Sequence, residues 1–181
     1  VDPRTMLRAA QIYIEASARN SRGTTFIVLQ GNHDMSRDAD KVSSFRIFKE
    51  LVSGCENIKV VDKASSIMFP KYNDMTFAFF PYLPFKTSEE VVKDFMTAGQ
   101  GKYMANEKYD AVFGHWDLDS FGDMPHNIFP AQSLMAITTD AYTGHIHLPD
   151  ERTYGPNQEL VLTVIGSMQP YNHSEDPQRK L

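Results

Sequence analysis

Three segments of the sequence place side chains that can bind metal or transfer protons directly after a strand-like run. These segments are Gly31-Asn32-His33-Asp34 after the run at 26–29, Gly114-His115 after 111–113, and Gly144-His145-Ile146-His147 after 140–143. Each has Gly at the junction, where we expect the backbone to turn sharply or to approach another group closely. Ligand sites in α/β sheets gather at the carboxyl ends of strands. We therefore expect the four histidines and the asparagine to converge on one crevice.

The spacing of these residues suits metal binding. Residues two apart in an extended segment face the same side, so His145 and His147 can both act as ligands. Imidazole combined with amide or carboxylate oxygen suits Mn, Fe or Zn, and the single cysteine, Cys55, leaves no thiolate set for a structural zinc. A lone histidine is more often a core or surface residue, which is our interpretation of His126 and His173. The order of the three motifs is the stronger signal.

Predicted helices and strands supply the frame for these motifs. Hydrophobic periodicity predicts helices at 4–19, 41–52 and 88–98, and strands at 24–29, 58–62, 75–84, 109–115, 136–145 and 159–167. We expect Thr87 or Ser88 to cap the third helix, with Glu89 or Glu90 nearby. The strand at 24–29 is expected to be buried on both faces. The helix at 41–52 is expected to bury Val42, Phe45, Phe48 and Leu51. Alternating helices and strands indicate an α/β layered fold.

Composition limits the class of protein. The chain has 181 residues, of which 41% are hydrophobic, enough for a globular domain with a real core. The formal net charge of −5 argues against a dedicated nucleic-acid coat but not against an enzyme that meets DNA through metal ions or a partner. The single cysteine excludes an internal disulfide framework and suits the cytoplasm. No apolar stretch is long enough for a membrane span, and no signal-peptide pattern opens the chain.

The motif series GNHD, GH and GHxH resembles the calcineurin-like metallophosphoesterases. Within that family, "VFGHWDLDSF", "YTGHIH" and "VIGSMQP" resemble the SbcD-type DNA nuclease subunits, especially their phage-encoded relatives. The resemblance covers nearly the whole chain. It implies an α/β metallophosphoesterase-type β-sandwich flanked by helices, with two metal ions on one side. Residues 1–170 would form a partial nuclease domain, and 171–181 a polar tail or the start of a following segment.

The chain departs from the family pattern at its N-terminus. The first family motif, Asp-x-His, is absent, and of the second, Gly-Asp-x-x-Asp, only the final Asp could remain, as Asp2. We therefore expect this chain to be the later part of a longer one, with the N-terminal part of the domain missing. By itself it is expected to be close to inactive and to hold at most one metal weakly, because the bridging carboxylate lies in the missing part.

The resemblance implies a role for each matching residue. The implied metal ligands are Asn32, His115 and His145 for the second ion and His147 for the first. His33 would instead face the scissile phosphate as general acid for the leaving oxygen. Asp2 would orient His33, and Asp34 is the other candidate for that role. Alternatively, Asp34 caps the turn in which it lies.

The resemblance implies a metal-dependent DNA nuclease, the SbcD-like subunit of a recombination and repair complex. Its cofactors would be two divalent ions, Mn first, with Mg, Fe or Zn as alternatives. Its partners would be DNA, an SbcC-like SMC-type ATPase and a second copy of itself, with no membrane. One alternative is a metallophosphoesterase acting on a small nucleotide or phosphoprotein substrate. Another is a non-catalytic interaction module on the same fold.

Two further sets of residues lie near the motifs in sequence. The aromatic set, Trp116, Phe121 and Phe129, could stack on bases, although ordinary packing is the favoured interpretation. The basic set, Arg37, Lys41, Arg46 and Lys49, could contact a phosphate backbone. Acidic residues are interspersed among these basic residues, so a solvated face is the default expectation.

Overall fold

The computed structural model describes residues 3–20, 23–35, 42–98, 108–118 and 127–167. The chain divides into two compact units, Val1–Asp62 and Lys63–Leu181. Within the described ranges the protein is mixed α/β, with four α-helices, a two-stranded sheet and a six-stranded sheet. None of the helices described is long and apolar enough to cross a membrane.

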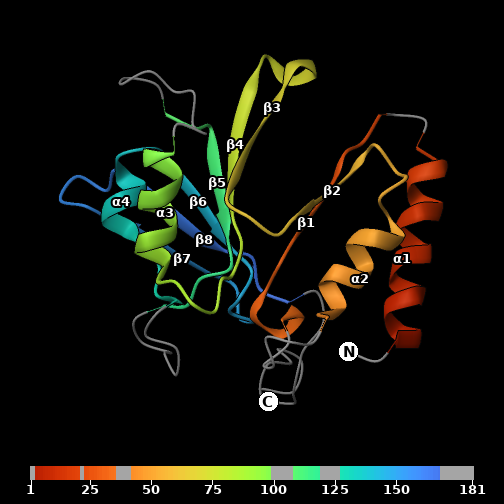
Figure 1. Ribbon diagram of the computed structural model, residues 1–181. Helices are drawn as coiled ribbons and strands as arrows, with labels where there is room; N and C mark the ends of the chain where they lie inside the picture. The colour runs from red at the N-terminus through yellow and green to blue at the C-terminus, as the bar shows by residue number, and fades with distance from the viewer. Residues whose placement is uncertain (1–2, 21–22, 36–41, 99–107, 119–126, 168–181) are drawn as a thin grey trace, which may run out of the picture. The chain divides into compact units, whose positions relative to one another are not determined.

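The first unit pairs two helices with a small parallel sheet (Figure 1). Its elements are α1 (Pro3–Ala18), β1 (Phe26–Leu29), α2 (Ser44–Leu51) and β2 (Ile58–Val61). Strand β1 runs parallel to β2, with Phe26 opposite Ile58. Among the described residues of this unit, one cluster of buried side chains consists of Met6, Ala10, Phe48, Val52 and Ile58. It is a small core because a two-stranded sheet offers little surface for burial.

Two expectations for this unit are wrong. The strand at 24–29 is not buried on both faces, since all four residues of β1 are only half-buried and β2 is its one partner among the described strands. In the helix predicted at 41–52, Phe45 and Phe48 are buried, but Val42 is 59% and Leu51 is 41% exposed. The helix begins only at Ser44, after the cap Ser43. Its 3.6-residue period continues the stripe to Val52, which is 1% exposed.

The second unit is built on a six-stranded sheet. Its elements are β3 (Ser65–Phe69), β4 (Met75–Phe80), α3 (Ser88–Thr97), β5 (Ala111–Gly114), α4 (Ala131–Met135), β6 (Asp140–Thr143), β7 (Asp150–Tyr154) and β8 (Leu160–Val164). The strand order is β3-β4-β5-β6-β8-β7. The four central strands are parallel, and β3 and β7 pair antiparallel at the edges. Strands β3 and β7 and helix α4 were not predicted.

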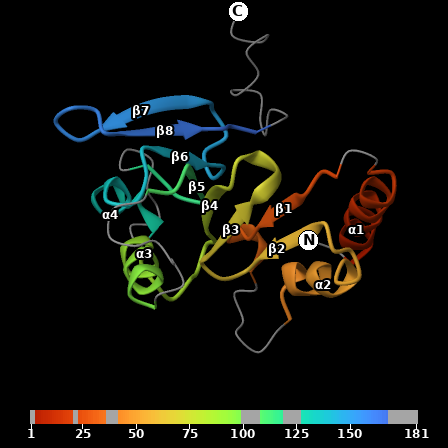
Figure 2. The ribbon, with the colours of Figure 1, turned by 90° about the horizontal axis from the view of Figure 1, so that it is seen from above.

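Helices α3 and α4 cover one face of this sheet (Figures 1 and 2). The core lies between these helices and the sheet, where side chains such as Phe80, Val92 and Leu134 are almost fully buried. The other face carries a row of aromatic rings. Phe113 stacks on Phe79 with ring centroids 5.4 Å apart and on Tyr142 with centroids 5.1 Å apart. The sheet therefore has apolar side chains on both faces.

The predicted cap of α3 is confirmed. Thr87 is the N-cap; its Oγ1 accepts a hydrogen bond from the Glu90 backbone N–H at 3.2 Å. The Glu90 carboxylate in turn accepts from the Thr87 backbone N–H at 2.7 Å. This reciprocal capping box satisfies two N–H groups that a helix start otherwise leaves without partners.

Candidate functional site

Strands β5 and β6 bring two of the predicted histidines together. The strands are parallel neighbours with Gly114 opposite Thr143, so the residues that follow leave the sheet at the same edge. His115 and His145 meet there, with His115 Nε2 3.0 Å from His145 Nδ1. The ring centroids are 4.7 Å apart. Two segments thirty residues apart in sequence thus bring two imidazole nitrogens within 3.0 Å of each other.

Hydrogen bonds hold His115 and Trp116, the first two residues after β5, in place. The Thr143 hydroxyl accepts from Trp116 N at 2.8 Å and donates to Trp116 O at 2.9 Å. Asn127 Nδ2 donates to His115 O at 2.7 Å. These bonds fix the backbone that follows the His115 side chain, and the pairing of Gly114 with Thr143 in the sheet fixes the backbone before it. The first histidine of the pair is therefore carried on an ordered support.

The structure requires glycine at only one of the three strand ends that carry the motifs. At Gly114 a Cβ would lie 2.3 Å from the Trp116 ring, so a close approach does require glycine there. At Gly144 a Cβ would meet nothing within 4 Å. Gly31 has extended backbone, φ −104° and ψ 178°, which any residue can adopt. A close approach therefore requires glycine at Gly114 but not at Gly144, where the chain bends over residues 145–148. Gly31 shows no conformational need for glycine.

A carboxylate that sequence reasoning did not assign also belongs to this site. Asp117 is 3% exposed, and its Oδ2 lies 3.9 Å from His145 Nε2. The signal was present in the sequence as His115-Trp116-Asp117, since residues two apart on an extended segment point the same way.

His147 lies two residues beyond His145, in the turn between β6 and β7, and is half-buried. Its carbonyl oxygen accepts a hydrogen bond from Ser167 N at 2.9 Å. No group of three or more His, Cys, Asp or Glu side chains placed to hold a metal ion occurs in the described part of the chain. The structure brings together the pair of histidines His115 and His145. A ligand role for His147 stays a prediction.

The GNHD motif forms a single 3-10 turn, Asn32–Asp34, directly after β1. Asp34 Oδ2 accepts a hydrogen bond from Gly31 N at 2.8 Å, so this carboxylate caps its own turn. His33 is exposed and Asn32 is half-buried. Asp2, the expected partner of His33, lies outside the described residues. The approach of Asn32 and His33 to the histidine pair stays a prediction.

The histidine pair fits a metal ion. Two imidazole nitrogens bound about 2.1 Å from one ion lie about 3.0 Å apart at neighbouring octahedral positions and about 3.4 Å apart in tetrahedral geometry. His115 Nε2 and His145 Nδ1 are separated by 3.0 Å. Without metal the same geometry is a hydrogen bond in which one ring donates and the other accepts. Nitrogen ligands favour Zn, Fe or Mn over Mg, which prefers oxygen.

No known family model matches this chain, and no curated protein is significantly similar to it. The site must therefore be interpreted from its motifs and its geometry.

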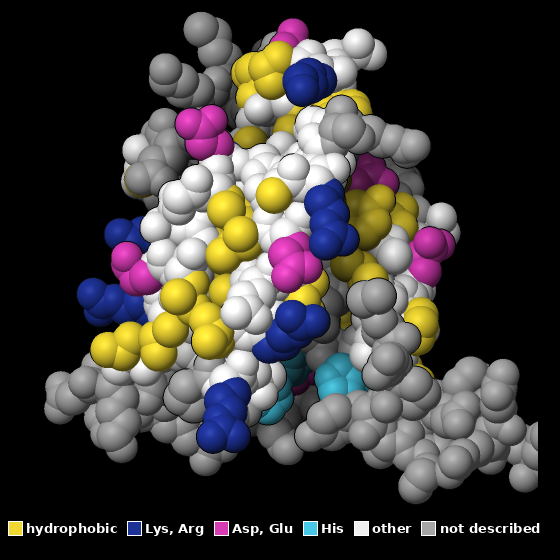
Figure 3. Space-filling model, turned by 90° about the vertical axis from the view of Figure 1, so that its right-hand side faces the viewer, with side chains coloured by type: hydrophobic (Ala, Val, Ile, Leu, Met, Phe, Trp, Pro, Cys, Tyr) yellow, Lys and Arg dark blue, Asp and Glu magenta, His cyan; other side chains and the backbone are white. Residues whose placement is uncertain are grey.

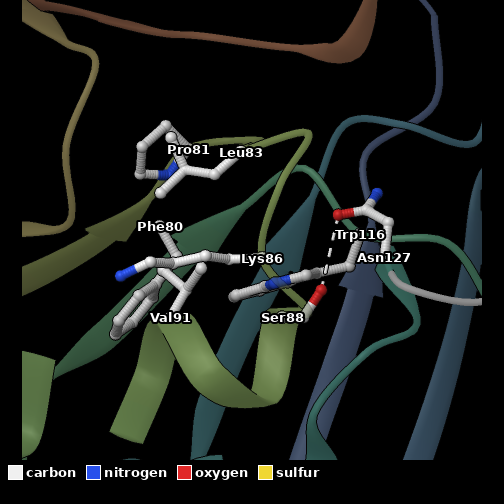
Figure 4. Close-up of a pocket in the computed structure, with 8 residues that line it drawn as sticks. All are labelled: Phe80, Pro81, Leu83, Lys86, Ser88, Val91, Trp116 and Asn127. Carbon is white, nitrogen blue, oxygen red and sulfur yellow. Dashed lines mark hydrogen bonds between the residues drawn. The ribbon is translucent and has the colours of Figure 1, made fainter. Parts of the chain in front are cut away.

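Beside the site, a small pocket opens between α3 and the segments that carry His115 and Asn127 (Figure 4). It is lined by Phe80, Pro81, Leu83, Lys86, Ser88, Val91, Trp116 and Asn127. Trp116 is 2% and Phe129 is 6% exposed, so packing rather than base stacking is confirmed for these two rings. Phe121, the third aromatic residue considered, lies outside the described residues. The Trp116 ring that lines this pocket is therefore part of the packed core next to His115.

The basic residues after GNHD form no single-sign patch where they are described. Lys49 Nζ is 2.6 Å from Asp62 Oδ2, and Arg46 is exposed. Arg37 and Lys41 lie outside the described residues. On the face shown in Figure 3, Lys and Arg side chains are interspersed with Asp and Glu, and histidine side chains reach the surface. This mixed distribution is that of an ordinary solvated face.

Proposed function

We propose that this chain is a metal-dependent phosphodiesterase whose substrate is DNA. The observation that carries the proposal is the 3.0 Å separation of His115 Nε2 and His145 Nδ1 at the ends of two adjacent parallel strands. Two imidazoles converge there at the spacing of neighbouring metal ligands. The GNHD, GH and GHxH series and its order along the chain support the same class of enzyme.

Each residue of the proposed site has one task. His115 and His145 would hold one ion. The motif resemblance adds Asn32 to that ion and gives His147 to a second. When bound, the two ions neutralise the phosphate charge and activate a water for attack. His33 donates a ring proton to the leaving oxygen. The exposure of His33 is consistent with this task, because a general acid must reach a substrate that enters from solvent.

The fold proposed for the whole domain is the metallophosphoesterase β-sandwich. The six-stranded sheet has helices on one face and the stacked rings of Phe79, Phe113 and Tyr142 on the other. An apolar sheet face needs a second layer to cover it, and a second sheet is what a sandwich supplies. DNA as substrate, an SMC-type ATPase as partner and a homodimer as the assembly rest on the SbcD-type resemblance.

The proposal is tested by assaying the full-length protein with Mn²⁺ on labelled single- and double-stranded DNA. We expect cleavage that a chelator abolishes. His115→Ala and His145→Ala should lose both Mn²⁺ binding and cleavage. Asp140→Asn is the matched control, since this carboxylate sits at the start of β6 and accepts from the Thr139 hydroxyl.

The other outcomes separate the rival functions. Cleavage of small phosphodiesters or nucleotides but not of DNA would replace the nuclease with a small-substrate phosphoesterase. Metal binding without hydrolysis of any of these would indicate the non-catalytic module. A wild-type protein that binds Mn²⁺ no better than His115→Ala would overturn the metal site itself.

A further inference from the structure

We propose that Asp117 is a positioning residue that holds the His145 imidazole through its Nε2, so that Nδ1 faces His115 and the metal ion. This inference rests on the proposed function, because it takes the two histidines as metal ligands. The observation behind it is a buried carboxylate oxygen, Asp117 Oδ2, 3.9 Å from the ring nitrogen of His145 that faces away from His115.

The burial of Asp117 requires an explanation. Its side chain is only 4% exposed, and a buried carboxylate is costly unless it is paired and hydrogen-bonded. Within the described residues its Oδ1 accepts from Leu118 N at 2.8 Å, whereas its Oδ2 faces His145. The imidazole is thus the group on this side of the carboxylate that can carry an N–H or a positive charge.

The backbone of Asp117 is fixed independently of its side chain. Asp117 N donates to Asn127 O, and Asp117 O accepts from Phe129 N, each at 3.0 Å. These bonds form an isolated parallel bridge between Asp117 and Ile128. The carboxylate is therefore presented to His145 from a rigid segment, as a positioning residue requires.

The two nitrogens of His145 must play opposite roles if the ring binds metal. The nitrogen that faces the ion presents a lone pair, so the proton resides on the other nitrogen. Here Nδ1 faces His115 Nε2 and Nε2 faces Asp117. A carboxylate that accepts this N–H selects the tautomer that metal binding needs. The 3.9 Å separation exceeds a hydrogen bond, and a movement of about 1 Å would form one.

Asp117→Asn separates this role from simple capping. Asparagine keeps the oxygen that accepts from Leu118 N, so a purely structural role survives. With that oxygen on Leu118 N, it turns its amide N–H₂ toward His145 Nε2 in place of the second carboxylate oxygen. We expect Mn²⁺ affinity, measured by calorimetry on the full-length protein, to fall about 10- to 100-fold. The matched control Asp140→Asn should bind Mn²⁺ like the wild type.

A second measurement reports the ring directly. Nitrogen-15 NMR of labelled histidine, at a pH above the ordinary imidazole range and without metal, distinguishes an Nε2–H ring from an Nδ1–H ring. We expect His145 to be Nε2–H in the wild type and to lose that preference in Asp117→Asn. The assignment of the His145 signal comes from its loss in His145→Ala.

The outcomes that overturn the inference are distinct from those that overturn the function. Unchanged Mn²⁺ affinity in a folded Asp117→Asn protein, or an Nδ1–H ring for His145 in the wild type, would remove the positioning role and leave the metal site intact. If Asp117→Asn does not fold, the wild-type tautomer still decides. If the wild type binds no Mn²⁺, the proposed function fails, and with it the role of Asp117 toward a metal.

Discussion

At the scale of single residues, the pair formed by His115 and His145 is the structural feature that gives the motifs chemical meaning. One imidazole has many uses, but two ring nitrogens 3.0 Å apart share either a proton or an ion. The GNHD turn is different in kind. There Asp34 has a structural task, since its carboxylate accepts from Gly31 N. His33, the exposed member of the motif, is the residue to which we assign proton transfer in the proposed function.

His33→Leu tests the division of labour between chemistry and metal binding. In the active enzyme we expect this change to lower turnover by about two to four orders of magnitude, the usual contribution of a general acid. Bound metal, measured by atomic absorption, should stay near the wild-type level. Asn32→Ala should have the opposite effect: it should first weaken binding of the second ion, the one assigned to His115 and His145. Loss of metal together with activity in His33→Leu would make His33 a ligand and refute the assignment.

At the scale of elements, adjacent parallel strands and tight packing determine where the histidines stand. Strands β5 and β6 end side by side, and the Trp116 ring packs on the backbone of Gly114. The ring also contacts Phe80 and Phe129, so it cannot move without disturbing the core. The position of His115 therefore depends on a packing contact made by its neighbours in sequence.

Gly114→Ala should damage this support. The new Cβ would lie 2.3 Å from the Trp116 ring, and overpacking of this kind costs about 1–3 kcal/mol. We expect a lower free energy of unfolding in urea and weaker Mn²⁺ binding. Gly144→Ala is the control at the second junction, where a Cβ meets nothing within 4 Å. Equal stability losses in the two variants would contradict the packing explanation.

The capping box of α3 predicts a dependence of stability on pH. The Thr87 backbone and side chain donate to the Glu90 carboxylate and hold its pKa below the ordinary value of 4.5. A lowered folded-state pKa means that this contribution is fully present above the unfolded-state pKa and is lost as pH falls through the folded-state value. Urea unfolding at pH 7 and pH 3 should show a smaller pH effect in Glu90→Gln than in the wild type. If the difference in stability between pH 7 and pH 3 is the same in Glu90→Gln and in the wild type, Glu90 does not contribute to the pH dependence of stability.

At the scale of the whole molecule, the two compact units differ in how much core each possesses. Lys63–Leu181 has a six-stranded sheet and a large cluster of buried side chains on its helix-covered face. The described residues of Val1–Asp62 form two strands and a core cluster of a few residues. A two-stranded sheet is marginal by itself in water. The histidine pair therefore belongs to the unit with the larger core, and the GNHD turn to the unit with the smaller one.

Hydrogen exchange should reveal this difference. Local opening needs less free energy where fewer apolar side chains are buried. We expect amides of β1 and β2 to exchange faster than those of β5, β6 and β8, measured by mass spectrometry of peptides from the native chain. Binding of Mn²⁺ should slow exchange around His115 and His145 first. Equal protection of both sheets would show that the smaller core does not limit the stability of its unit.

The sequence by itself predicted most of the helices and strands, and it identified the residues that can bind metal or transfer protons. Apolar periodicity predicted α1, α2 and α3 and most central strands, because those patterns are local. The capping box at Thr87 and Glu90 was predictable for the same reason. Elements with weak or short patterns were missed, among them the edge strands β3 and β7, whose mixed burial gives no clear alternation.

Only the tertiary structure decided which residues meet. The 3.0 Å contact between His115 and His145 depends on β5 and β6 being parallel neighbours, and nothing in either segment alone specifies that register. The positioning role proposed for Asp117 follows from its burial and from its closeness to the His145 ring, and the sequence shows neither. Gly114 and Gly144 look alike in sequence but differ in space, because a tryptophan ring packs on one and not on the other. Local patterns name candidate groups, whereas non-local packing sets the distances on which chemistry depends.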